Sequence, residues 1–165
     1  MVDYFNIFRN DYCDNFREIR KTLENVALLA AFIPIISGMS GNSGTQSLAV
    51  SVRNITTGEI NEQSKFRIAL REAGSGVLSG VVCSTILFTI IVAIYHQPLL
   101  ALIVAGSLTC AMTVGTFVGS MIPLLMNKLN IDPAVASGPF ITTINDIISM
   151  LIYFGLATSF MAYLI

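Results

Sequence analysis

Residues 74–127 read GSGVLSGVVCSTILFTIIVAIYHQPLLALIVAGSLTCAMTVGTFVGSMIPLLMN and contain no Asp, Glu, Lys or Arg. The short polar sequence His96-Gln97-Pro98 interrupts this stretch near its middle. A helix needs about 20 apolar residues to cross a bilayer. The stretch is too long for one crossing, and it therefore predicts two transmembrane helices that are joined by a tight turn at residues 96–98.

The composition of the whole chain is typical of a membrane protein. Of its 165 residues, 54% are hydrophobic and 12% are charged, the net charge is −1, and the mean hydropathy is +0.74. Soluble domains carry about twice that share of charge. This balance excludes a disordered chain, a nucleic-acid-binding module and a typical cytosolic enzyme. We expect a multi-pass protein of the cell membrane that is surrounded by lipid and binds no nucleic acid.

Two more apolar segments flank the central pair, so the sequence predicts four transmembrane helices. We place them at about residues 26–53, 74–95, 99–126 and 137–165, with a polar connection over residues 53–73. The predicted fold class is all-α, a polytopic bundle of four transmembrane helices with an N-terminal amphipathic helix. The bundle would form a transmembrane domain over residues 25–165.

The first two dozen residues have a different pattern. Large apolar side chains recur there at intervals of three or four among charged residues, which is typical of one face of a helix. These side chains are Phe5, Phe8, Tyr12, Phe16, Ile19 and Leu23. We expect residues 1–24 to form an amphipathic helix at the membrane surface or against a partner.

Pairs of glycines four residues apart occur in both central segments. Gly76 and Gly80 share one helix face, as do Gly115 and Gly119. Small residues with this spacing let two transmembrane helices approach closely. We interpret both pairs as helix-packing positions.

Asp146 is the main chemical signal, because it is the only acidic residue inside the apolar part of a predicted span. A carboxylate at that depth is costly and commonly marks an ion path or a proton site. Small or polar residues continue along one face of the same helix, and this stripe predicts one wall of an aqueous pore. The stripe consists of Gly138, Thr142, Asp146, Ser149 and Tyr153. We expect Pro139 to weaken the helix above Asp146 and free a carbonyl. The alternative is a structural Asp that is hydrogen-bonded to nearby hydroxyls.

The sequence SGNSGTQS at residues 40–47 is unusually polar for the middle of a membrane span. Lipid would not tolerate it, so this segment must face protein or water. Asn42, Thr45 and Gln46 carry side-chain oxygens that can either meet a hydrated cation or hydrogen-bond a neighbouring helix. The sequence leaves both roles open.

Oxygen ligands of this kind suit a hard cation such as Mg²⁺, which proteins hold through one or two carboxylates while several waters remain bound. One Asp per chain is sparse. A two-fold homodimer would supply a second Asp146 and neutralise a divalent charge. Two alternatives stay open, a proton-coupled transporter that uses Asp146 and a non-conducting membrane assembly subunit. No HExxH or GxSxG constellation is visible, and we do not expect an enzyme.

The chain resembles the membrane domain of the MgtE family of magnesium channels and transporters. The resemblance runs from Thr22 to Ile165 and rests on FIPIISGMSGNSGTQSLAVSVR (32–53) and DPAVASGPFITTINDIISMLIYFGLA (132–157). It implies a homodimer that moves hydrated Mg²⁺ down its electrochemical gradient through a pore between subunits. The carboxylate of Asp146 would select the ion, and the carbonyl of Thr142 would face it. Further pore-lining residues would be Asn42, Gln46, Gly41, Gly138 and Ser149.

The resemblance is incomplete at the N-terminus. The family's membrane domain has five spans, and residues 1–21 stand where an apolar first span would be. Family members also commonly carry cytoplasmic domains that sense magnesium, and the resemblance does not include them. We therefore expect a fragment, one half of a split transporter, or a minimal form. Gating by intracellular magnesium is not implied for this chain.

Overall fold

The computed structural model describes residues 2–58, 65–135 and 137–164, and for residues 2–26, 65, 134 and 161–164 it describes the backbone alone. The elements in chain order are α1 (Val2–Thr56), α2 (Lys65–Tyr95), α3 (Pro98–Lys128), a short 3-10 helix η2 (Pro133–Val135) and α4 (Gly138–Leu164). The described chain contains helices and connections without a strand. The predicted all-α membrane bundle is confirmed.

Each of the four long helices contains a segment that is long and apolar enough to cross a membrane. These segments are Ala27–Thr56, Phe66–Tyr95, Pro98–Lys128 and Gly138–Phe160. The polar connection expected over residues 53–73 is shorter in the structure, because α2 already begins at Lys65. Lys, Arg, Glu and Ala are good helix formers, so this charged sequence extends the helix beyond its apolar part.

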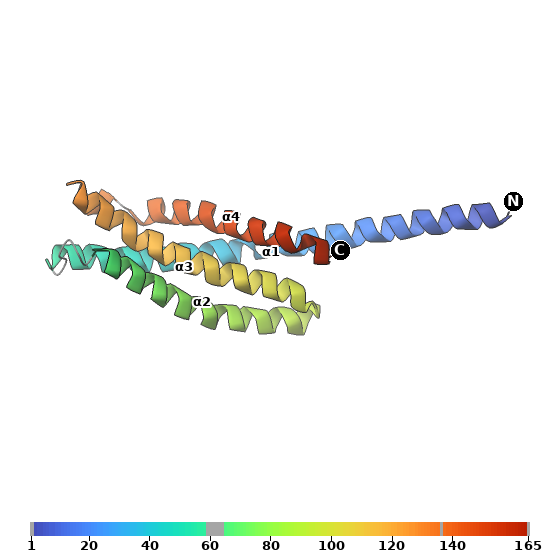
Figure 1. The fold of residues 1–165 in the computed structure, drawn as a ribbon, viewed down its shortest axis with the longest axis horizontal. Coiled ribbons are helices and arrows are strands. Elements are labelled where there is room, and N and C mark those ends of the chain that lie inside the picture. The colour runs from blue at the N-terminus through green and yellow to red at the C-terminus, as the bar shows by residue number, and fades with distance from the viewer. Residues whose placement is uncertain (1, 59–64, 136, 165) are drawn as a thin grey trace.

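The N-terminal part of the chain is helical and continuous with the first span. α1 is one helix of 55 residues, and its N-terminal part projects beyond the other three helices (Figure 1). The amphipathic helix predicted for residues 1–24 has no separate boundary here. Its side chains lie outside the described residues, so its position at a membrane surface stays a prediction.

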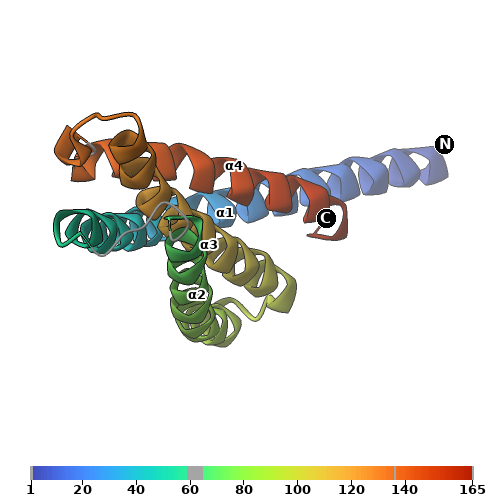
Figure 2. The same cartoon turned by 60° about the vertical axis from the view of Figure 1, so that its left-hand side comes forward.

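α3 is the central helix of the bundle. It packs against α2 on one side and against α1 and α4 on the other, whereas α1 and α2 meet over a short distance (Figures 1 and 2). The core is formed by apolar side chains of α3 together with large side chains of the neighbouring helices. It includes Phe32, Ile36, Ile91, Leu100, Ala101, Val104, Leu108, Ala111 and Tyr153.

The glycine pairs mark the sites of closest helix approach, as predicted. A methyl group at Gly80 would lie 3.1 Å from the Cα atom of Thr109 on α3. One at Gly119 would overlap the backbone of Gly44 on α1. Because lipid is as apolar as leucine, close van der Waals packing of this kind drives helix association in a membrane.

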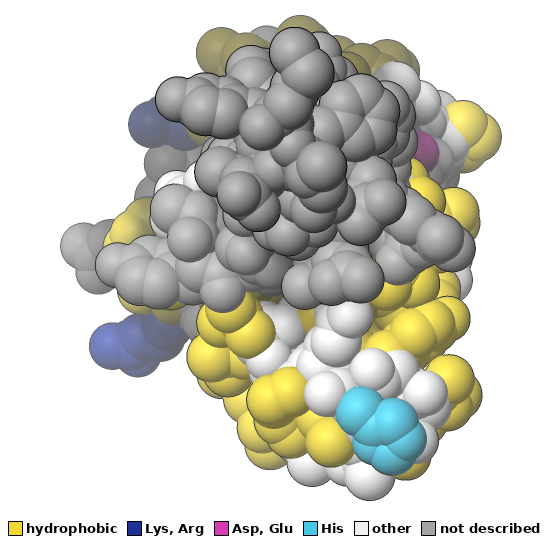
Figure 3. Space-filling model, turned by 90° about the vertical axis from the view of Figure 1, so that its right-hand side faces the viewer, with side chains coloured by type: hydrophobic (Ala, Val, Ile, Leu, Met, Phe, Trp, Pro, Cys, Tyr) yellow, Lys and Arg dark blue, Asp and Glu magenta, His cyan; other side chains and the backbone are white. Residues whose placement is uncertain are grey.

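The predicted turn between the central helices lies at residues 96–97. His96 adopts a φ of 53°, and Pro98 occupies the first turn of α3, where its missing N–H costs nothing. His96 is exposed, and Figure 3 shows the histidine at the surface of this end of the molecule, beside both white and yellow atoms. It therefore lies at the C-terminal end of α2.

Candidate ion-binding site

Asp146 lies in the third turn of α4 and is half-buried. The hydroxyl of Ser37 on α1 donates a hydrogen bond to its Oδ1 atom over 2.5 Å. The backbone carbonyl of Asp146 accepts a second bond from Ser149 Oγ, at 3.0 Å. One carboxylate oxygen is thus held by a neutral donor, and no cation pairs with it among the described residues.

The polar stripe of α4 faces α1, and the two helices run antiparallel along it. At the far end the hydroxyl of Tyr153 donates to the carbonyl oxygen of Leu29 over 2.7 Å. At the near end a methyl group placed on Gly138 would contact Thr45 at 3.8 Å. The stripe that the sequence predicted as a pore wall is therefore, within one chain, the contact surface between α4 and α1.

Gly41 allows α1 and α4 to approach each other closely beside the Asp146 carboxylate. A Cβ atom built on Gly41 would lie 3.3 Å from Thr142 Cγ2 and 3.7 Å from Asp146 Oδ1. Both glycine and carboxylate come from segments that the sequence analysis singled out. The structure thus brings together Gly41, Thr142 and Asp146, and it adds Ser37 to them.

The structure changes the role expected for Pro139. α4 begins at Gly138, so Pro139 lies in the first helical turn and interrupts no helix above Asp146. A proline there loses no intrahelical hydrogen bond. Its carbonyl oxygen accepts bonds from the hydroxyls of Thr142, at 2.9 Å, and Thr143, at 2.8 Å. The expectation of a carbonyl freed by a break in the span is wrong.

Asn42 and Gln46 lie on an exposed face of α1, one turn apart. Within the described chain neither side chain hydrogen-bonds another helix, although the backbone carbonyl of Asn42 accepts a bond from Thr45 Oγ1 at 2.8 Å. Among the described side chains neither amide is hydrogen-bonded to Asp146, whose carboxylate is bound by Ser37. Of the other predicted pore-lining residues, Gly138 is half-buried and Ser149 is fully buried.

The sequence analysis missed three polar residues inside the bundle. Ser37 binds Asp146, Asn145 is fully buried beside α1 and α3, and Glu72 accepts a hydrogen bond from Ser47 at 2.8 Å. Glu72 is thus a second carboxylate within a membrane-capable helix, because α2 starts earlier than predicted. Ser37 precedes Gly41 by one helical turn, and this spacing is the signal that could have revealed it.

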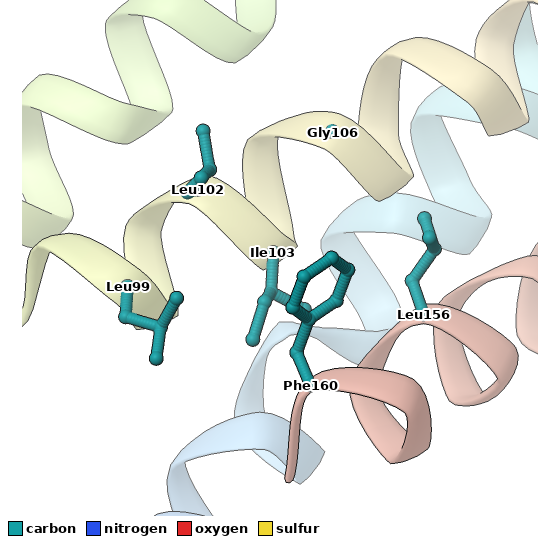
Figure 4. A pocket seen from close by; sticks show the side chains of 6 residues that line it. All are labelled: Leu99, Leu102, Ile103, Gly106, Leu156 and Phe160. Carbon is teal, nitrogen blue, oxygen red and sulfur yellow. The ribbon is translucent and has the colours of Figure 1, made fainter. Parts of the chain in front are cut away.

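Two grooves on the surface of the bundle are apolar. One, of about 170 Å³, lies between α3 and α4 and is lined by Leu99, Leu102, Ile103, Gly106, Leu156 and Phe160 (Figure 4). The other, of about 220 Å³, lies between α1 and α2. Hydrocarbon linings offer no oxygen ligand to a hard cation. Among the residues with described side chains, no three His, Cys, Asp or Glu residues gather as a metal site.

Comparison with known proteins gives a consistent result. The family model MgtE, described as a divalent cation transporter, matches residues 33–156. The magnesium transporter MgtE of Bacillus subtilis is 46% identical over 138 residues, which is 84% of this chain and 31% of that protein. The magnesium transporter MgtE of Enterococcus faecalis is 41% identical over 87% of this chain and 32% of its own length.

A third relative extends the comparison to a thermophile. The magnesium transporter MgtE of Thermus thermophilus is 34% identical over 82% of this chain and 30% of that protein. The chain therefore spans about a third of the length of the curated relatives it matches. The family match at residues 33–156 includes Ser37, Gly41 and Asp146.

Proposed function

Because this chain belongs to the MgtE family of divalent cation transporters, we propose that it forms a pathway for Mg²⁺ in which Asp146 binds the passing ion. Membership places the chain among multi-pass membrane transporters rather than enzymes. The ion is cargo, so it needs a site that is selective and releases it readily. No energy source beyond the ion gradient is required, since two charges crossing 100 mV release about 4.6 kcal/mol.

The observation that carries the proposal is that three oxygen-bearing side chains lie in the membrane-capable segments of α1 and α4. Asp146 is half-buried, and Asn42 and Gln46 are exposed on the outside of the single chain. Amides and carboxylates that faced lipid would be strongly unfavourable. This surface therefore has to face water or a second protein chain.

A second copy of the chain would cover this surface and leave space for water at the ion. Two chains related by a two-fold axis would place their α1 and α4 surfaces opposite each other and bring two carboxylates to one ion. Two Asp146 side chains carry the charge that neutralises Mg²⁺. The amides of Asn42 and Gln46 would hydrogen-bond the water that the ion keeps. The pore of this proposal lies between the subunits.

The contact of Asp146 with Ser37 fits a site of moderate affinity. A carboxylate that already accepts a hydrogen bond carries less free charge toward an incoming ion than an unpartnered one. Mg²⁺ gives up its water reluctantly. We therefore place the carboxylate in contact with the water shell of the ion, with the Thr142 carbonyl one turn away on the same side. Selectivity then depends on the fit of the hydrated ion.

The test is Mg²⁺ flux into liposomes that contain the purified full chain, measured with a Mg²⁺-sensitive dye. We expect flux from the original chain and its loss in Asp146→Asn, which removes charge but keeps shape. Glu72→Gln is the matched control, because it removes the other carboxylate of a membrane-capable helix, and it should retain flux.

Other outcomes would decide for the alternatives. Flux that collapses with a protonophore would indicate proton coupling through Asp146. No flux from a folded chain, together with loss of oligomer in Asp146→Asn, would indicate an assembly subunit. Unchanged flux in Asp146→Asn would contradict the proposal.

A further inference from the structure

Among the side-chain amides that the structure describes, Asn145 is the most deeply buried. Its side chain is fully buried where α4 meets both α1 and α3. Its Nδ2 atom donates to the carbonyl oxygen of Gly115 on α3 at 3.4 Å, and its Oδ1 atom has no hydrogen-bond partner in the described structure. Burying an amide with such incomplete pairing is unfavourable. Bundle stability alone therefore does not account for an amide at this position.

Two glycines make the space for this amide. A methyl group at Gly44 on α1 would overlap Nδ2 of Asn145, and one at Gly115 would lie 3.4 Å from the same atom. The amide therefore fills a recess between two helix backbones. A residue larger than glycine at position 44 or 115 would close this recess. Such a fit, with a directional hydrogen bond, fixes the rotation and the height of a helix against its neighbours.

The rotation of α4 decides where Asp146 points. Consecutive residues in an α-helix are about 100° apart around the axis. When Asn145 enters the recess between Gly44 and Gly115, Asp146 is directed toward α1, where it accepts the bond from Ser37. A turn of α4 by a fraction of that angle would move the carboxylate away from Ser37 and Gly41.

We infer that Asn145 is a positioning residue, whose buried amide holds α4 in the rotation that aims Asp146 at the α1 surface. This inference rests on the proposed function, since it gives Asn145 a role in ion binding through Asp146. It adds a residue that does not touch the ion. The glycines Gly44 and Gly115 are part of the same device, because they form the recess.

A disulfide can report the rotation without any ion. In a cysteine-free chain (Cys13→Ser, Cys83→Ala, Cys110→Ala), Gly41→Cys and Thr142→Cys would place two Cβ atoms about 3.6 Å apart. That separation suits a disulfide. The rate of oxidative cross-linking in membranes then reports the rotation of α4 relative to α1. Mg²⁺ flux is measured separately, in chains without these two cysteines.

The test variant is Asn145→Leu, whose side chain has the same branching and number of heavy atoms but no amide. We expect cross-linking to slow by about fivefold or more and flux at low Mg²⁺ to fall by about tenfold, since small misplacements of a charged group are costly. The control is Thr158→Leu, on the same helix, where an exposed hydroxyl bonds only its own helix, at 2.7 Å to Phe154 O. It should leave both measurements within twofold.

A second variant tests the recess without changing Asn145. Gly44→Ala leaves Asn145 unchanged but displaces its amide, so it should slow cross-linking as well. In the double variant Gly44→Ala/Asn145→Ala the overlap is relieved. Cross-linking should then be no slower than in the slower of the two single variants, Gly44→Ala and Asn145→Ala.

Three outcomes of these measurements decide between the inference and its failure. Normal cross-linking in both Asn145→Leu and Gly44→Ala would overturn the inference, whether or not flux is lost. Slower cross-linking with normal flux would uphold the positioning of α4 and contradict the role of Asp146 in the proposed function. Slower cross-linking together with reduced flux supports the inference and the proposed function.

Discussion

Ser37 of α1 donates a hydrogen bond to Asp146 of α4 over 2.5 Å, and the two residues are 109 positions apart in the chain. This bond joins the polar sequence of the first span to the carboxylate of the last. It also occupies one lone pair of the carboxylate in the ion-free state. We expect an arriving cation and its water to compete with the Ser37 hydroxyl for Oδ1.

Ser37→Ala removes this competition. A hydrogen bond to a charged group contributes about 1.5–3 kcal/mol, so we expect the half-saturating Mg²⁺ concentration for flux to fall by roughly tenfold or more. The measurement is liposome flux as a function of Mg²⁺ concentration. Thr158→Ala is the control. A higher half-saturating concentration in Ser37→Ala would instead mean that the hydroxyl binds the loaded ion.

Mg²⁺ should stabilise the folded chain through Asp146. A ligand at one hundred times its dissociation constant adds about 2.7 kcal/mol to folding stability, which corresponds to a rise of several degrees in the unfolding temperature. We expect this rise for the original chain in detergent and not for Asp146→Asn. Glu72→Gln should keep it. An equal rise in all three chains would show that Mg²⁺ binds elsewhere.

Tyr153→Phe tests the end of the contact between α4 and α1. The Tyr153 hydroxyl donates to the carbonyl of Leu29 at 2.7 Å in a buried position. Interhelical hydrogen bonds in membranes contribute about 0.6 kcal/mol on average and up to about 1.7 kcal/mol. We expect a lower unfolding temperature in detergent with flux at saturating Mg²⁺ unchanged. Tyr95→Phe, at the exposed end of α2, should have no such effect.

Gly76 and Gly74 form a matched pair on α2. A methyl group at Gly76 would lie 2.9 Å from the carbonyl oxygen of Met112 and 3.0 Å from the Cα atom of Thr113, whereas one at Gly74 would meet nothing within 4 Å. Overpacking of this kind costs about 1–3 kcal/mol. Gly76→Ala should therefore lower the unfolding temperature, and Gly74→Ala should leave it unchanged or raise it slightly. Equal effects would show that α2 can move away from α3.

The sequence determined the membrane class, the four spans and the α-helical fold, because hydrocarbon imposes length and hydropathy on every crossing segment. The glycine pairs also revealed where helices pack closely, since only small residues permit that approach. Asp146 was identifiable because a carboxylate in an apolar span is costly and rare. These are local properties, and they can be read without knowing which helices are neighbours.

Only the tertiary structure decided which side chains of different helices contact each other. That Ser37 meets Asp146, that Asn145 fills a recess between Gly44 and Gly115, and that Glu72 binds Ser47 all depend on how the helices rotate and pair. A polar stripe has the same sequence pattern whether it faces water or another helix. In this chain it faces α1, where Ser37 and the Leu29 carbonyl hydrogen-bond to it and Gly41 allows close approach.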